Sequence, residues 1–149
     1  MCIDYRELNK ATLKYHFPLP FIDQVLDTLA GKKYFSFLDG FSGYNQIRVA
    51  PEDQENTTFT CPWGTYAYKV LPFCLCNAPA TFQRAILGIF SNILHDCVEF
   101  SMEYFTVMGD NFEEALHNLE KKFQICGETN LSLSNEKCFM IMTDRKSVV

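Results

Sequence analysis

The sequence lacks any apolar run of the roughly 18 to 20 residues that a membrane-spanning helix needs. Its first ten residues, MCIDYRELNK, carry charges where a signal peptide has its apolar core. Internal repeats, low-complexity segments and long linkers are also missing. We therefore expect a single intracellular structural unit without a membrane partner, and its 149 residues suffice for a real hydrophobic core.

Neither the cysteines nor the histidines follow the spacing of a disulfide framework or a metal site. The seven cysteines are an odd number, and the pair Cys74 and Cys76 is one residue too close for a common zinc knuckle. The three histidines are scattered along the chain. We expect reduced, mostly buried thiols of an intracellular protein and no zinc site.

A dense run of basic residues is absent as well. The chain has 13 Lys and Arg against 18 Asp and Glu, which gives a net charge of −5. Its basic residues occur as separated pairs typical of solvated surface, namely Lys32-Lys33, Lys121-Lys122 and Arg145-Lys146. Because phosphate contacts need clustered Lys and Arg, the balance argues against an autonomous, strongly basic nucleic-acid binder.

What the sequence does contain is the pattern of a globular α+β domain. Helical spacing of apolar residues predicts a helix within 21–30, and Gly31 is expected to end it. Alternating and aromatic-rich runs predict strands at 33–39, 46–49, 57–60, 65–70, 97–102, 105–108, 131–133 and 137–142.

Two further helices have clear start signals. Asn77-Ala78-Pro79 predicts a capped helix start, with the apolar stripe Phe82, Ile86, Ile89 and Ile93. Asp110 or Asn111 is expected to cap a second helix, which has the stripe Phe112, Leu116, Leu119 and Phe123 and ends near Gly127. The element order predicts an antiparallel sheet with helices on one face.

Three segments combine residue types that carry chemistry. In FLDGFSGYNQI, Asp39 ends an apolar strand; LPFCLCNAPATFQR leads into a helix; VEFSMEYFTVMGD predicts a hairpin with Glu103-Tyr104 at its tip. Taken singly, each is also compatible with ordinary structure: a turn-forming Asp, a packed helix start and a solvated turn.

Together and in this order, the segments resemble the reverse transcriptase domain of gypsy-type LTR retrotransposons. The resemblance runs through CIDYRELNKAT, PLPFID, YFSFLDGFSGYNQI, APEDQENTTFTCPWGTYAYKVLPF, NAPATFQR and EKC, and so covers essentially the whole chain. It implies a right-hand polymerase architecture within a Pol polyprotein. Residues of about 1–14 and 48–77 would be fingers-like, and about 15–47 and 78–149 palm-like.

The resemblance also implies a chemistry: RNA-directed DNA polymerisation on an RNA or DNA primer-template with dNTP, by two Mg²⁺ ions bound to carboxylates. Asp39 and Glu103 would be the metal-ligand positions, Tyr44 the steric gate beneath the sugar, and Lys137 a proton donor to pyrophosphate. The remaining nucleotide-binding positions would be Gly43, Phe73, Gln83 and Arg84.

The sequence departs from the family pattern at the hairpin, where the family has an Asp-Asp pair. Glu103 keeps a carboxylate but is one methylene longer, and Tyr104 replaces an expected Asp ligand with a phenol of pKa about 10. A loss of about 4 kcal/mol of transition-state stabilisation would slow catalysis roughly a thousandfold. Cys74 also stands where the family has a glycine.

Three functional hypotheses therefore stand beside one another. In the first hypothesis the chain is an active polymerase domain. In the second it is a degenerate and truncated copy without thumb, connection and RNase H. In the third it is a domesticated non-catalytic module that binds nucleic acid or protein. The altered hairpin favours the degenerate copy.

Overall fold

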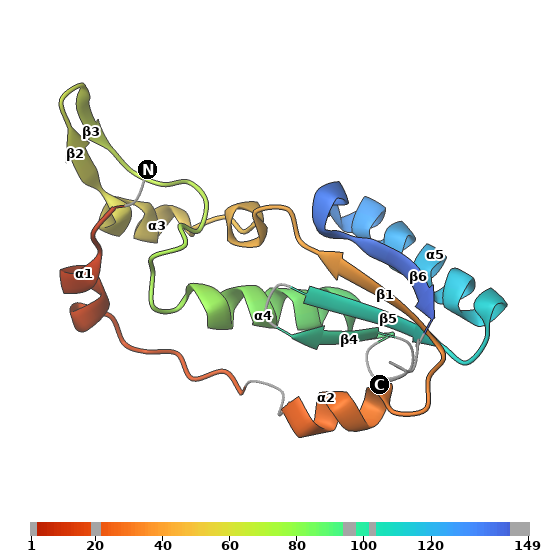
Figure 1. Cartoon of the computed structure of the whole chain (residues 1–149). Helices are drawn as coiled ribbons and strands as arrows, with labels where there is room; N and C mark the ends of the chain where they lie inside the picture. The colour runs from red at the N-terminus through yellow and green to blue at the C-terminus, as the bar shows by residue number, and fades with distance from the viewer. Residues whose placement is uncertain (1–2, 19–21, 94–97, 102–103, 144–149) are drawn as a thin grey trace, which may run out of the picture. The chain divides into compact units, whose positions relative to one another are not determined.

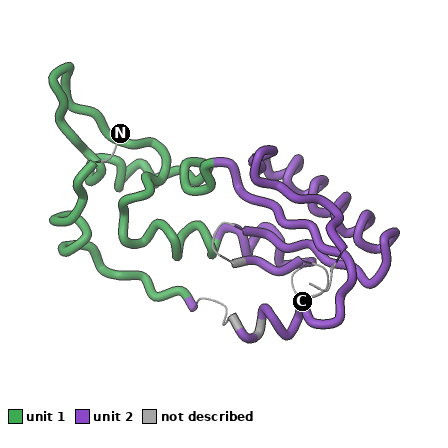
Figure 2. The backbone as a smooth tube through the Cα atoms, viewed as in Figure 1, with its two compact units in different colours: residues 1–17, 42–84 green, residues 18–41, 85–149 purple. Residues whose placement is uncertain are grey.

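The computed structural model describes residues 3–18, 22–93, 98–101 and 104–143. The chain forms two compact units, each built from separate stretches (Figure 2). Unit 1 comprises residues 1–17 and 42–84, and unit 2 comprises residues 18–41 and 85–149. Within the described ranges, no helix has both the length and the apolarity to cross a membrane.

Unit 1 is built mainly from short elements (Figure 1). These are α1 (Arg6–Ala11), η1 (Gly43–Gln46), α3 (Pro51–Gln54), η2 (Glu55–Thr57), β2 (Phe59–Cys61), β3 (Gly64–Tyr66) and the first part of α4 (Ala78–Phe90). Its small core consists of Val49, Leu71 and Ala78, against which Tyr44, Ile47 and Leu75 pack. The Tyr5 hydroxyl joins the N-terminal segment to η2 by donating to the Thr57 carbonyl at 2.6 Å.

The strands expected in this unit are shorter than the pattern predicts. At 46–49 there is no strand: η1 ends at Gln46, and only an isolated bridge joins Arg48 to Val70. The expected strands at 57–60 and 65–70 become the three-residue β2 and β3. Thr57 belongs to η2, because its hydroxyl closes that turn by donating to the Gln54 carbonyl at 2.7 Å.

Unit 2 has the α+β architecture that the sequence predicts. Its elements are α2 (Ile22–Leu29), β1 (Tyr34–Asp39), the rest of α4, β4 (Val98–Ser101), β5 (Tyr104–Gly109), α5 (Phe112–Thr129), η3 (Asn135–Lys137) and β6 (Phe139–Thr143). Four strands form one antiparallel sheet in the order β4-β5-β1-β6. Helix α5 packs along this sheet (Figure 1). The expected strand at 131–133 is reduced to a bridge between Gly40 and Leu133.

The sheet separates a buried face from a more open one. Leu38 pairs with Phe105 in register, and both are fully buried. The Phe105 ring also meets Phe90 of α4 edge-on, with the centroids 5.4 Å apart. Because neighbouring residues on a strand alternate between faces, Phe37 and Asp39 project from the other side of β1. This alternation directs Asp39 away from the helices.

Helix α5 begins where predicted but buries a different side. Asn111 is its N-cap and accepts a hydrogen bond from the Glu114 amide at 2.8 Å. Of the predicted stripe only Leu119 is buried, whereas Phe112, Leu116 and Phe123 are exposed. The buried side consists of Ala115, Asn118, Leu119, Lys122 and Cys126. The helix continues past Gly127 to Thr129, and Asn130, whose φ of 55° lies in the left-handed region, caps its last turn.

Two other expectations need correction. Lys122 is fully buried and therefore does not belong to the solvated surface expected of a Lys-Lys pair. The five cysteines that the structure describes form no disulfide, but only Cys126 is buried and the other four are partly exposed, so they are not mostly buried. In α4, Phe82, Ile86 and Phe90 are buried and Ile89 is partly buried, whereas the partly buried Ile93 lies beyond the end of the helix at Phe90.

Candidate functional site

The carboxylate at the end of β1 is buried and paired. Asp39 is 2% exposed, and its Oδ2 lies 3.3 Å from Nζ of Lys137. The Asp39 carbonyl accepts a hydrogen bond from the Ser134 amide at 2.8 Å. This bond brings the loop before η3, and with it Lys137, to the end of β1. Two residues predicted from separate segments thus form one ion pair within unit 2.

The neighbouring strand offers a phenol beside this carboxylate. Tyr104 lies directly opposite both Asp39 on β1 and Ser101 on β4. It is therefore the first residue of β5 rather than part of a hairpin tip. Glu103 lies outside the described residues. Among the described ones, no group of three or more His, Cys, Asp or Glu side chains could hold a metal ion.

The donor set does not fit two magnesium ions. Mg²⁺ takes hard oxygen ligands, usually carboxylates, in near-octahedral geometry. The sequence provides a buried Asp39 that already contacts an ammonium group, a longer carboxylate at Glu103, and a phenol at Tyr104. We therefore derive no metal-dependent step from this set.

The turn at Gly43, the first of the predicted site residues in unit 1, requires a glycine. A Cβ on Gly43 would lie 2.8 Å from Cζ of the Phe82 ring, closer than real Cβ atoms come. The preceding Ser42 has a φ of 47°, in the left-handed region that non-glycine residues rarely adopt. The tight turn thus places the backbone at Gly43 directly against α4.

Three aromatic side chains gather beside that turn. The Tyr44 ring lies 5.6 Å from the Phe73 ring and 5.3 Å from the Phe82 ring, measured between centroids. Both contacts are inclined, at 58° and 68°, as aromatic pairs prefer. Phe73 is 75% exposed, so the group presents an aromatic surface to solvent. Such a surface can support the flat face of a sugar or base.

Helix α4 sends the remaining predicted residues in different directions. At 100° per residue, Arg84 projects from nearly the opposite side of the helix to Phe82. The Arg84 guanidinium lies 5.4 Å from the Tyr15 ring centroid in a cation–π contact. Gln83 is 2% exposed, and neither polar atom of its amide has a hydrogen-bond partner among the described residues. Gly43, Tyr44 and Phe73 are thus brought together, whereas Gln83 and Arg84 lie apart from them.

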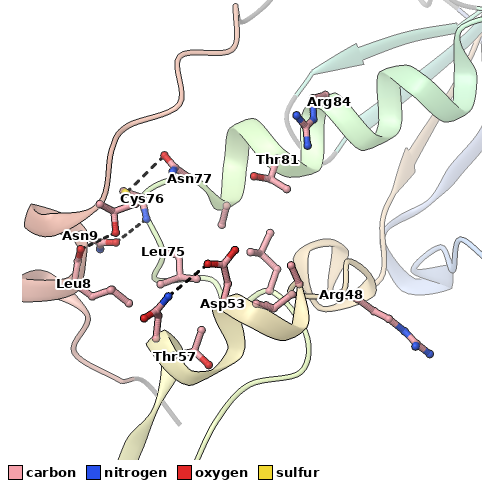
Figure 3. Close-up of a pocket in the computed structure, with 16 residues that line it drawn as sticks. Leu8, Asn9, Arg48, Asp53, Thr57, Leu75, Cys76, Asn77, Thr81 and Arg84 are labelled. Carbon is pink, nitrogen blue, oxygen red and sulfur yellow. Dashed lines mark hydrogen bonds between the residues drawn. The ribbon is translucent and has the colours of Figure 1, made fainter.

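A pocket of about 470 Å³ opens beside Arg84, and unit 1 alone lines it (Figure 3). Its apolar lining includes Val49, Leu71, Leu75 and Ala78. The Asn77 amide is already engaged, because its Oδ1 accepts from the Tyr15 amide and its Nδ2 donates to the Leu13 carbonyl, both at 2.9 Å. Asn77 therefore holds the N-terminal segment against the start of α4. Asp53, whose Oδ1 accepts a hydrogen bond from Nδ2 of Asn56 at 3.4 Å, and Thr81 also face the pocket (Figure 3).

Sequence reasoning missed two contributors to these surroundings. Phe82 was expected only in the buried stripe of α4, yet it also packs against Tyr44 and excludes a side chain at Gly43. Tyr15 carried no signal, since its role depends on Arg84, far along the chain. The NAPATFQR segment held the available clue for Phe82, because it places Phe82 within the matched block.

Comparisons with known proteins agree with the sequence resemblance. A family model described as reverse transcriptase (RNA-dependent DNA polymerase) matches residues 1–148. The chain is 41% identical over 142 residues to the retrovirus-related Pol polyprotein from transposon 412 of Drosophila melanogaster, covering 95% of this chain and 12% of that protein. It is 36% identical to an RNA-directed DNA polymerase homolog of Oenothera berteroana, covering 87% of this chain and 90% of the relative.

Solved structures of foamy viral protease-reverse transcriptase share the fold. One in complex with dsDNA matches with a TM-score of 0.85 at 24% identity and covers 94% of this chain and 24% of that one. Another in complex with an RNA/DNA hybrid matches with a TM-score of 0.83 at 25% identity, covering 92% and 18%. The chain thus spans only about an eighth of the transposon polyprotein and under a quarter of these viral chains. With a family match over almost its full length, the chain belongs to the reverse transcriptase family, as a domain of the kind found in retrotransposon and retroviral Pol polyproteins.

Proposed function

We propose that the chain is the reverse transcriptase domain of a gypsy-type retrotransposon Pol polyprotein whose catalysis is impaired in this copy. The relatives' activity is RNA-directed DNA polymerisation on a primer-template with dNTP as substrate. The observation that carries the impairment is Tyr104, which occupies the strand position opposite Asp39. A phenol is a poorer ligand for Mg²⁺ than the carboxylate that the family has there.

The retained residues support assignment to a nucleotide-handling site. Asp39 ends β1 in a buried position, and the Gly43–Tyr44 turn follows it after three intervening residues. In this proposal Tyr44 and Phe73 form the surface beneath the incoming nucleotide. Lys137 would serve as proton donor, and its contact with Asp39 places it beside the carboxylate. Gln83 and Arg84 would contact template or nucleotide.

The division into fingers and palm is part of the same proposal. Residues of about 1–14 and 48–77, which fall within unit 1, would be fingers-like. Residues 15–47 and 78–149, which include the four-stranded sheet, would be palm-like. In the family, divalent ions would bind at the positions of Asp39 and Glu103, and because a phenol stands at the third ligand position we expect this copy not to hold both ions.

A primer-extension assay tests the impairment. The segment of an active family member that matches this chain is replaced by the chain itself, either unchanged or with Glu103→Asp and Tyr104→Asp. We expect the unchanged chimera to extend a primer at least about a thousandfold more slowly than the parent, which corresponds to about 4 kcal/mol. We expect the doubly substituted chimera to recover much of that loss.

Two controls sharpen the result. Adding Asp39→Asn to the restored chimera should abolish extension again, because it removes the carboxylate at the end of β1. Rapid extension by the unchanged chimera, with Mg²⁺ or Mn²⁺, would refute the impairment. If the restored chimera stays inactive, the hairpin is not the sole defect, and Cys74→Gly is the next substitution. Retention of primer-template at about 0.15 M salt without extension would instead favour a binding module.

A further inference from the structure

A lysine without a hydrogen-bond acceptor lies at the centre of unit 2. Lys122 of α5 is 0% exposed, and its Nζ has no hydrogen-bond partner among the described residues. The Nζ lies 3.7 Å from the ring centroid of Phe90 and 3.1 Å from that of Phe105. We call the space between these two rings the aromatic slot. It joins α4, α5 and β5 at a single side chain.

The charged groups around the slot do not compensate an ammonium ion. Cys126, one turn along α5, and Cys138 are the ionisable groups with an electrostatic effect on Lys122. The remaining ionisable groups of α5, including Glu120, Lys121 and Glu128, are mainly on its exposed side. In the described parts of α4 within unit 2 and of β6, no residue is ionisable. Strand alternation directs Asp39, Glu99 and Tyr104 to the opposite face of the sheet.

We propose that Lys122 makes the packing of α4 and α5 on β5 sensitive to protonation. The neutral amine fills the aromatic slot, and the protonated form leaves it and loosens the contact of both helices with Phe105. Removing an ammonium ion from water without a counter-ion is strongly unfavourable. Two cation–π contacts offset only part of this penalty. The device stands apart from polymerase activity, because it depends only on packing within unit 2.

The direction of the pH effect follows from burial. Burial lowers the pKa of Lys122 from 10.5 to about 7, so between these values the unfolded chain binds more protons than the folded one. Stability therefore rises with pH across this window. We expect the unfolding equilibrium constant to fall roughly tenfold from pH 7.5 to 8.5 and to change only about twofold from pH 6 to 7. Burial raises the pKa of the Cys126 thiol, whose opposing effect sets in at higher pH.

The experiment is urea unfolding of the full chain from pH 6 to 8.5, with Lys122→Met and with Lys121→Met as the matched exposed control. The Lys122→Met protein should be more stable at pH 7 and should lose the tenfold dependence, whereas Lys121→Met should keep it. The hydrogen-exchange protection factors of the β5 amides, which are corrected for the intrinsic pH dependence of exchange, should fall below pH 7 in the parent and not in Lys122→Met.

The Lys122→Arg variant tests whether the aromatic slot favours a neutral amine or a cation. A guanidinium group stays charged at these pH values, so Lys122→Arg should be less stable than the parent throughout. Equal pH profiles for the parent and Lys122→Met, or a Lys122→Arg protein as stable as the parent, would overturn the proposal.

Discussion

The corner between β5 and α5 depends on the absence of a side chain at Gly109, and Gly109→Ala tests this directly. A Cβ built at Gly109 would lie 2.5 Å from the backbone nitrogen of Ala115 and 2.8 Å from its Cα. Ordinary carbon contacts are about 3.5–4.0 Å, so the overlap is roughly 1 Å. The obstacle is helix backbone, which cannot rotate away as the end of a flexible side chain can.

The magnitude follows from what must move. Helix α5 packs on the sheet through its buried side, which includes Leu119 and Cys126. A displacement of 0.5–1 Å already forfeits about a quarter to a half of each dispersion contact along that side. Overpacking a core lowers the free energy of unfolding by about 1–3 kcal/mol. Because the neighbour of Gly109 is rigid backbone, we expect Gly109→Ala to lower it by about 3 kcal/mol, the upper end of that range.

Urea unfolding followed by circular dichroism measures this loss. With a slope of about 1–3 kcal/mol per M, the midpoint should fall by about 1–3 M. Gly88→Ala in α4 and Gly127→Ala in α5 are matched controls, because a Cβ at either position meets no atom within 4 Å. Each control should stabilise the helix by about 0.5–1 kcal/mol. A Gly109→Ala midpoint equal to or above the parent's would show that the close approach of β5 to α5 is wrong.

Three further substitutions test other features by the same unfolding assay. Asn111→Ala removes the side chain that caps α5, so the chain should lose about 1 kcal/mol, and Asn111→Ser should retain most of the stability. Gln83→Met replaces a buried amide without partners by an apolar chain of similar shape and should stabilise by about 1–2 kcal/mol; a loss of stability would reveal a partner for the amide. Lys137→Met leaves the buried Asp39 carboxylate without its cation and should destabilise by about 1–2 kcal/mol near pH 7, a moderate value because Lys137 is 67% exposed. An unchanged midpoint for Lys137→Met would mean that the ion pair does not form in solution.

The sequence predicted the longer elements of the fold because their signals are local. Helix α2, strand β1 and the starts of α4 and α5 carry apolar periodicity or a capping residue within a few positions. The expected strand at 46–49 failed for the opposite reason. Its two residues with sheet-like hydrogen bonds, Ile47 and Val49, depend on partners at Leu71 and Lys69, which no local pattern identifies.

Helix α5 shows how tertiary packing overrides an apolar stripe. Periodicity favoured the side with Phe112, Leu116 and Phe123, but the structure buries the side with Ala115 and Lys122. Ala115 lies so close to β5 that a Cβ added at Gly109 would come within 3.0 Å of its backbone and side chain. A pair of adjacent lysines predicts an exposed surface, so nothing in the sequence indicated that Lys122 lies between two aromatic rings.

For the candidate site, residue types were predictable and their grouping was not. Asp39, Tyr44 and Lys137 follow from matched blocks, and the contact between Asp39 and Lys137 requires the turn at Ser134 that η3 provides. Gln83 and Arg84 follow Phe82 directly in the matched block. Rotation of about 100° per residue along the helix turns both side chains away from the aromatic group that Phe82 joins. Sequence adjacency on a helix therefore overstates how many residues share one site.

The Asp39–Lys137 pair connects the altered hairpin with the stability of the sheet. A carboxylate that is 2% exposed is costly unless a cation or hydrogen bonds compensate it. With Tyr104 instead of a second carboxylate opposite Asp39, the described surroundings carry less negative charge, and one ammonium group suffices as counter-ion. Restoring an Asp at position 104 would place two carboxylates on facing strand positions beside a single lysine, and like charges directly opposite destabilise a sheet. The same substitution that restores the ligand set for metal should therefore lower the stability of the metal-free chain, so that catalytic competence and stability without metal oppose each other at this one strand pair.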